Sequence, residues 1–201
     1  LRCMEETLQA CREINPEFSV SIESHDWDRP LEYGNVAWNW IPNNSRDWKL
    51  SNIMKYTFPE WVDSCTIYQP YDYNVVNNAV RYGFFLHIAF GNWTSYMGDE
   101  LYKPLSNYIK EIQRLRGDLK DTIYMGEYLD NLEADVEVPE DMRYGVHRNT
   151  ESGKRAVVAI NFDTEPHDLS VMSFEGNTGG PVYIYEPFKE RVEGRLPLGL
   201  V

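Results

Sequence analysis

Residues 65–90 read CTIYQPYDYNVVNNAVRYGFFLHIAF, and this stretch decides the fold class. Cys65 to Tyr68 is a short apolar run of the kind that forms a buried strand, and polar residues follow it. Asn74 to Tyr82 can form a helix, and Phe84 to Phe90 is a second apolar run. The order strand, helix, strand predicts a βαβ unit whose parallel strands are buried on both faces.

The same alternation continues on both sides of this unit. Apolar residues recur at helical spacing up to Asn15-Pro16, and a strand pattern covers Phe18 to Ile22. Residues 27–63 are rich in Trp, Asn and Pro, which predicts a loop with a helix near Trp48 to Met54. A further helix is expected from Tyr102 to Arg116, with a capping glycine behind it. Residues 1–120 therefore predict an α/β fold with three parallel strands.

The period of the apolar residues changes from helical to alternating after Lys120. Four segments are strand-like and are separated by Asn, Gly, Pro and Asp turns: residues 143–146, 155–162, 169–174 and 182–185. We therefore predict a second domain over residues 121–201, a small antiparallel all-β domain of the β-sandwich type. No constellation of reactive side chains stands out in it, and we expect His147 and His167 to be isolated and exposed.

Composition excludes several classes of partner. The formal net charge is −13, so the surface repels phosphate backbones and anionic membranes, whereas neutral sugars remain compatible with it. No run approaches the roughly 20 apolar residues that span a bilayer. Three cysteines form neither a disulfide framework nor a metal motif. We expect no nucleic acid, no membrane, no metal and no cofactor.

The three expected strands of the first domain all end in polar and aromatic residues. All six tryptophans lie in or near the loops that follow these strands: Trp27, Trp38, Trp40, Trp48, Trp61 and Trp93. In βα folds, ligands bind beyond the C-terminal ends of the strands. Sugar rings stack on aromatic faces, and their hydroxyls hydrogen-bond to carboxylates, amides and histidine. The pattern favours a carbohydrate site, although tryptophans packed between helices would produce the same count.

Glu23 is the strongest catalytic candidate, because partial burial at a strand end raises the pKa of a carboxyl group. Glycoside cleavage uses two carboxyl groups, and Asp26 is the partner that we select, with Asp28, Asp72 or a residue on another strand as alternatives. The expected substrate-binding residues are His25, Trp27, Asp72, Asn92 and Trp93. The alternative is that Glu23 binds an arginine or caps the strand, and that Asp72 and Asn92 only form turns.

Two other chemistries are weaker. Ser24-His25-Asp26 cannot form a catalytic triad, because successive strand residues point to opposite faces. Glu23 and His25 could begin a metal site with His87, but scattered ligands are a weak signal. We interpret His87 as a core or pocket-floor histidine.

Several segments give the chain a resemblance to a known superfamily. They are the strand ending in Ser21-Ile-Glu23-Ser-His-Asp26, the segment Met54–Glu60, the strand Gly83–Phe90, and the helix Tyr102–Arg116 followed by Asp121–Asp130. This order resembles the C-terminal portion of glycoside-hydrolase-like (β/α)8 barrels of the α-amylase and α-galactosidase type, in a poorly characterised bacterial branch. There, the last barrel helix leads into a C-terminal antiparallel β-domain.

The resemblance implies a partial TIM-type barrel in residues 1–120 and a glycosidase that acts on a neutral oligo- or polysaccharide. Glu23 matches the acidic strand-end position, as nucleophile or acid/base. A closed barrel needs eight strands, so we expect the missing N-terminal barrel segment in the same full-length protein, before Leu1. An extracytoplasmic bacterial location would suit this class. The alternative is a non-catalytic carbohydrate-binding or structural module derived from such a barrel.

Overall fold

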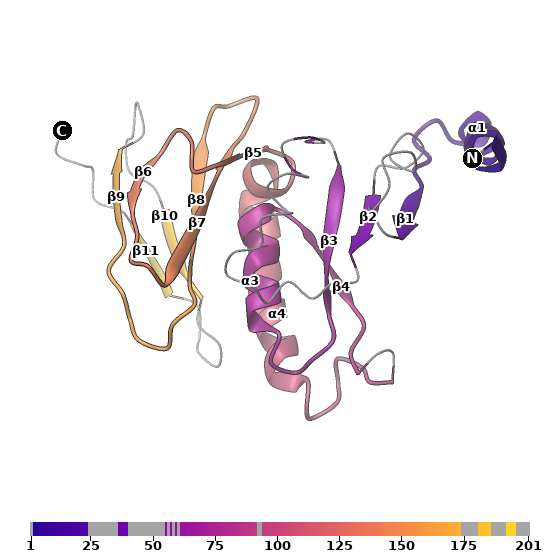
Figure 1. Ribbon diagram of the computed structural model, residues 1–201. Coiled ribbons are helices and arrows are strands. Elements are labelled where there is room, and N and C mark those ends of the chain that lie inside the picture. The colour runs from indigo at the N-terminus through magenta and orange to yellow at the C-terminus, as the bar shows by residue number, and fades with distance from the viewer. Residues whose placement is uncertain are drawn as a thin grey trace.

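Figure 1 shows the chain as a computed structural model. The structure describes residues 2–23, 36–39, 55, 57, 59, 61–91, 94–173, 181–185 and 192–195. Its α-helices are α1 (Arg2–Ile14), α3 (Tyr73–Tyr82) and α4 (Lys103–Leu119), and a π-helical turn follows at Lys120–Tyr124. None of the described helices combines the length and the apolar character that a membrane crossing requires.

A four-stranded parallel sheet forms the first layer. Its strands lie in chain order, β1 (Ser21–Glu23), β2 (Val36–Asn39), β3 (Val62–Ile67) and β4 (Phe85–Ile88). Five of the six residues of β3 are buried, as expected for a parallel strand covered on both faces. The α/β fold and the βαβ unit of β3, α3 and β4 are therefore confirmed.

Two predictions for this half of the chain need correction. Residues 27–63 were expected to lack strands, but Val36–Asn39 forms β2 between β1 and β3. Four residues are too few for a recognisable alternation, and their strand conformation depends on hydrogen bonds from both neighbours. Helix α4 also runs past Arg116 to Leu119, so Gly117 lies inside it. The helix expected near Trp48 to Met54 lies outside the described residues.

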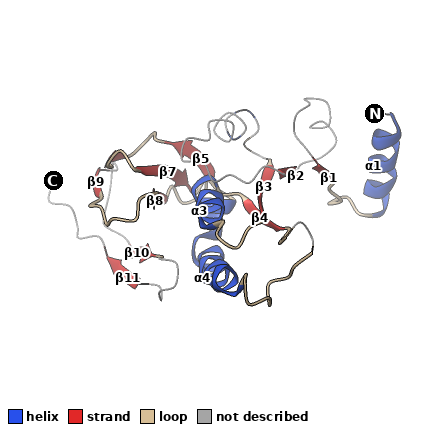
Figure 2. Cartoon of the chain, turned by 60° about the horizontal axis from the view of Figure 1, so that its bottom comes forward, coloured by secondary structure: helices blue, strands red, loops and turns tan. Residues whose placement is uncertain are grey.

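Helices α3 and α4 pack side by side on one face of the parallel sheet (Figures 1 and 2). Their shared core includes the fully buried or nearly fully buried Cys65, Ile67, Val75, Val76, Ala79, Leu105, Ile109 and Ile112. Each buried aliphatic side chain of this size contributes roughly 1.5–3 kcal/mol to folding. The sheet and the two helices therefore share one hydrophobic core.

Antiparallel strands form a third layer on the other side of the helices (Figure 1). One sheet has the order β5 (Glu127–Asp130), β7 (Met142–Arg148), β8 (Arg155–Asn161). Two further pairs are β6 (Asp135–Glu137) with β9 (Ser170–Ser173), and β10 (Pro181–Ile184) with β11 (Val192–Arg195). The four predicted segments coincide with β7, β8, β9 and β10, whereas β5, β6 and β11 were not anticipated.

The antiparallel layer shares its core with the helices. Tyr128 of β5 belongs to the same buried cluster as α3 and α4, and Ala156 and Val158 of β8 pack against that cluster. The secondary structure changes at Lys120 as expected, since α4 ends at Leu119. The division into units 1–120 and 121–201 stays a prediction, because the hydrophobic core continues across it.

His147 is the buried link between these layers, which corrects the expectation that it is exposed. Its side chain is 0% exposed and its Nε2 lies 2.8 Å from the carbonyl oxygen of Arg81, in the last turn of α3. The ring also packs 5.3 Å from the ring of Tyr128, measured between centroids. The neighbouring Val146 is also fully buried, so both faces of β7 are covered here, and α3 covers the face that carries His147.

Acid is expected to unfold the protein partly through His147. Burial lowers the pKa of this imidazole from 6.5 to about 4, and the hydrogen bond to Arg81 opposes that shift only in part. Between these values the unfolded chain binds a proton that the folded chain excludes, so stability falls as the pH drops from 6.5 to 4. The full loss is about 3 kcal/mol. Urea unfolding at several pH values measures it.

His147→Gln is the matched variant, because the glutamine amide can still donate to the Arg81 carbonyl but does not titrate. Between pH 6.5 and 4, the free energy of unfolding of the variant should depend on pH less steeply than that of the wild type, by the contribution of one titrating proton. A slope identical to that of the wild type would exclude His147 as its source.

Candidate functional site

The C-terminal edge of the parallel sheet brings two loops together. The loop after β3 and the loop after β4 meet through backbone contacts, in which the Gly91 N–H donates to the Tyr68 carbonyl at 3.0 Å. The Tyr102 hydroxyl, at the start of α4, donates to the same carbonyl at 3.0 Å. We call residues 68–72 and 91–101 together, without the undescribed Asn92 and Trp93, the rim. It lies at the lower end of the sheet in Figure 1.

Asp72 fixes the part of the rim that follows β3 through hydrogen bonds to its backbone. Its side chain is 0% exposed, and its Oδ2 accepts the backbone N–H groups of Tyr68 at 2.9 Å and of Gln69 at 2.8 Å. These bonds fold the loop between β3 and α3 back onto the aspartate. Of the two roles considered for Asp72, the structure displays the turn-forming one. Contact with a sugar hydroxyl stays a prediction for it.

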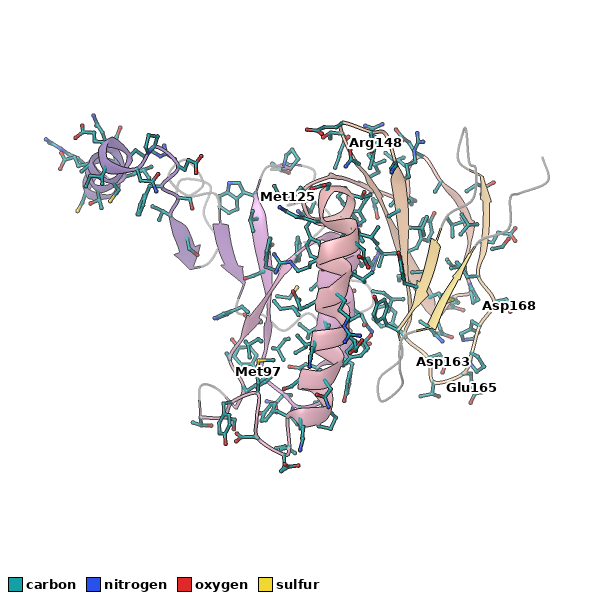
Figure 3. The ribbon with its side chains drawn as sticks, turned by 180° about the vertical axis from the view of Figure 1, so that it is seen from behind. Met97, Met125, Arg148, Asp163, Glu165 and Asp168 are labelled. Carbon is teal, nitrogen blue, oxygen red and sulfur yellow. The ribbon has the colours of Figure 1, made fainter. Side chains whose placement is uncertain are left out.

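Large apolar side chains are exposed at the rim. Tyr71 is 69% exposed, Tyr96 is 69% exposed and Leu101 is 68% exposed. Figure 3 labels Met97, which is 42% exposed, at this same end of the sheet. Exposed tyrosine rings can stack on sugar C–H faces. The sequence analysis predicted tryptophans as the stacking residues and did not predict these rim tyrosines. Their position after the strand ends is the signal that could have identified them.

The sheet face opposite the helix core carries both polar and apolar side chains, because Phe85 pairs with Ser64 in the register. Cys65 and Ile67 of β3 point into the helix core, so Ser64 and Thr66 lie on the other face, where they are 5% and 0% exposed. His87 of β4 pairs with Thr66, and its Nδ1 lies 3.2 Å from the Thr66 hydroxyl oxygen. This contact gives His87 a hydrogen-bond partner within the sheet, which fits the interpretation of His87 as a core or pocket-floor histidine. Hydroxyl and imidazole groups on one sheet face can hydrogen-bond a polar ligand.

Glu23 is the last residue of β1, and in backbone register it pairs with Trp38, which pairs with Ser64. All four strands run in the same direction, but this register places Glu23 level with Ser64 and Phe85, three residues before the last residues of β3 and β4. The other predicted site residues lie outside the described residues: Asp26, His25, Trp27, Asn92 and Trp93. Their roles stay predictions.

A second group of ionisable side chains, Lys55, Asp63 and Cys65, lies in or near β3. Burial lowers the pKa of the Lys55 amine, and the nearby Asp63 carboxylate partly offsets that effect. Lys55 Nζ also lies 5.4 Å from the centroid of the Phe84 ring. Burial, reinforced by Asp63, raises the pKa of the Cys65 thiol, which therefore stays protonated and unreactive. Asp63 lies in the N-terminal half of β3, away from the rim, where a stabilising role is expected.

The chain was compared with known proteins in three ways. A scan of protein families, a search of curated proteins and a search of solved structures each found no match. The chemistry of the site therefore rests on the chain's own residues.

Proposed function

We propose that this chain is the C-terminal part of a glycoside-hydrolase barrel that cleaves a neutral oligo- or polysaccharide at the rim. The observation that carries the proposal is the strand order. Four parallel strands follow one another in chain order, and both α3 and α4 lie on one face. This arrangement fits a barrel, which keeps its strands in chain order and all its helices outside, and it also occurs within each half of a doubly wound sheet.

The polar side chains on the sheet face opposite the helices support the same proposal. In a barrel, the face opposite the helices is the interior, and ligands bind where that interior opens at the C-terminal ends of the strands. Ser64, Thr66 and His87 occupy this face. The remaining strands would come from an N-terminal segment of the same full-length protein and would pair with the outer strands β1 and β4.

The proposed chemistry uses a pair of carboxyl groups. Glu23 and Asp26 flank the glycosidic bond, one as acid or nucleophile and the other as its partner. His25 and Asn92 bind sugar hydroxyls, Trp27 and Trp93 provide stacking surfaces, and Asp72 holds the loop that carries Tyr71. No cofactor is required for this mechanism.

The test is hydrolysis by the full-length protein. We expect it to release reducing sugar from at least one member of a panel of neutral α- and β-linked oligosaccharides, with no added metal. Binding of a neutral oligosaccharide without hydrolysis would favour the non-catalytic carbohydrate-binding module instead. Neither binding nor hydrolysis across the panel would reject a carbohydrate function.

A further inference from the structure

Two loops of the antiparallel layer meet at one end of the hairpin of β7 and β8. Met142, the first residue of β7, pairs with Asn161, the last residue of β8. The backbone continues this pairing by one step, because the Phe162 N–H donates to the Asp141 carbonyl at 3.0 Å. The turn that ends at Asp141 is therefore held against the loop that begins at Phe162.

Three metal-binding side chains converge at this junction. One ligand atom from each of Asp141, Asp163 and His167 lies within 4.8 Å of the other two. His167 Nε2 and Asp163 Oδ2 are 3.2 Å apart. Zinc holds nitrogen and oxygen ligands at about 2.1 Å in a tetrahedral array, which separates neighbouring ligand atoms by about 3.4 Å. The contact between His167 Nε2 and Asp163 Oδ2 has nearly this spacing, and the ligand atom of Asp141 lies within 4.8 Å of both.

The loop orients Asp163 toward the histidine. Its Oδ1 accepts the Thr164 N–H at 2.6 Å, while its Oδ2 faces His167. Asn161 fixes the same loop, since its Oδ1 accepts the Asp163 N–H at 2.9 Å and its side-chain amide donates to the Glu165 carbonyl at 2.7 Å. The carboxylate is therefore held in one orientation.

We propose that Asp141, Asp163 and His167 bind a first-row divalent cation of the zinc class. The donor set decides the class of ion: imidazole suits zinc, nickel and cobalt, whereas calcium takes oxygen ligands only. Three protein ligands leave the remaining position to water. The ion would clamp the turn before β7 to the loop after β8, far from the rim at which hydrolysis is proposed (Figure 3 labels Asp163 and Met97). The sequence predicted no such site, because its ligands come from two separate loops.

Calorimetric titration of the metal-free protein with zinc chloride tests this proposal, with calcium chloride as the comparison. We expect saturable zinc binding that includes this site and no calcium binding there. Asp163→Asn and His167→Gln should each weaken the zinc affinity of the site at least about tenfold. Zinc should also raise the melting temperature of the wild type more than that of either variant.

Asp168→Asn is the matched control, because it removes an exposed carboxylate from the same loop without touching the three ligands. It should bind zinc as the wild type does. Absence of zinc binding would overturn the proposal. Zinc binding that is unchanged in both ligand variants would also overturn it, because the ion would then bind elsewhere. Equal losses of zinc affinity in all three variants would overturn it as well, because they would indicate only general charge attraction.

Discussion

Replacing Glu23 with glutamine in the full-length protein is expected to lower kcat by about 10³-fold or more. Glutamine has nearly the same shape as glutamate, but it can neither transfer a proton nor attack an anomeric carbon. If Glu23 is one of the two catalytic carboxyl groups, the transition state loses its main stabilising group while substrate binding is largely retained. Steady-state hydrolysis of the best oligosaccharide measures the effect.

Glu100→Gln is the matched control for this experiment. Glu100 is an exposed rim carboxylate whose Oε1 pairs with Lys103 Nζ at 3.1 Å. Its removal should leave kcat within about twofold of the wild-type value, because exposed ion pairs contribute little. A Glu23→Gln protein that is folded and retains near-normal kcat would remove Glu23 from the mechanism.

Replacing Gly83 with alanine is expected to destabilise the fold by about 3 kcal/mol. Gly83 ends α3 with φ +68°, a left-handed conformation that disfavours any side chain with a Cβ. A Cβ at this buried position would also collide with the carbonyl oxygen of Ile123, in the π-helical turn after α4. That oxygen belongs to backbone and cannot rotate away, so α3 and the turn would have to separate. Urea denaturation measures the change in the free energy of unfolding.

Gly153 separates the two causes of this loss. It has nearly the same backbone conformation, with φ +69°, but a Cβ there would meet no atom within 4 Å. Gly153→Ala should therefore cost only the left-handed strain of about 1 kcal/mol. Equal losses in the two variants would show that crowding against Ile123 contributes nothing.

Asp72 and His147 illustrate how far the sequence could describe individual side chains. Asp72 was located correctly after a buried strand, yet its carboxylate turns inward to the N–H groups of Tyr68 and Gln69. Sequence allowed both roles, and only the path of the loop selects one. His147 occupies an alternating strand, but its burial depends on α3, whose Arg81 lies 66 residues earlier.

The sequence by itself determined the α/β class, the unit of β3, α3 and β4, and the change to antiparallel strands after α4. These features follow from local periodicity, because apolar spacing records which side of each element is buried. Only the tertiary structure decided that β2 exists, that His147 is a core residue, and that Asp141 meets Asp163 and His167. Each of these depends on partners brought from elsewhere in the chain: short strands form on the hydrogen bonds of their neighbours, and burial or ligand geometry arises only when separate segments pack together.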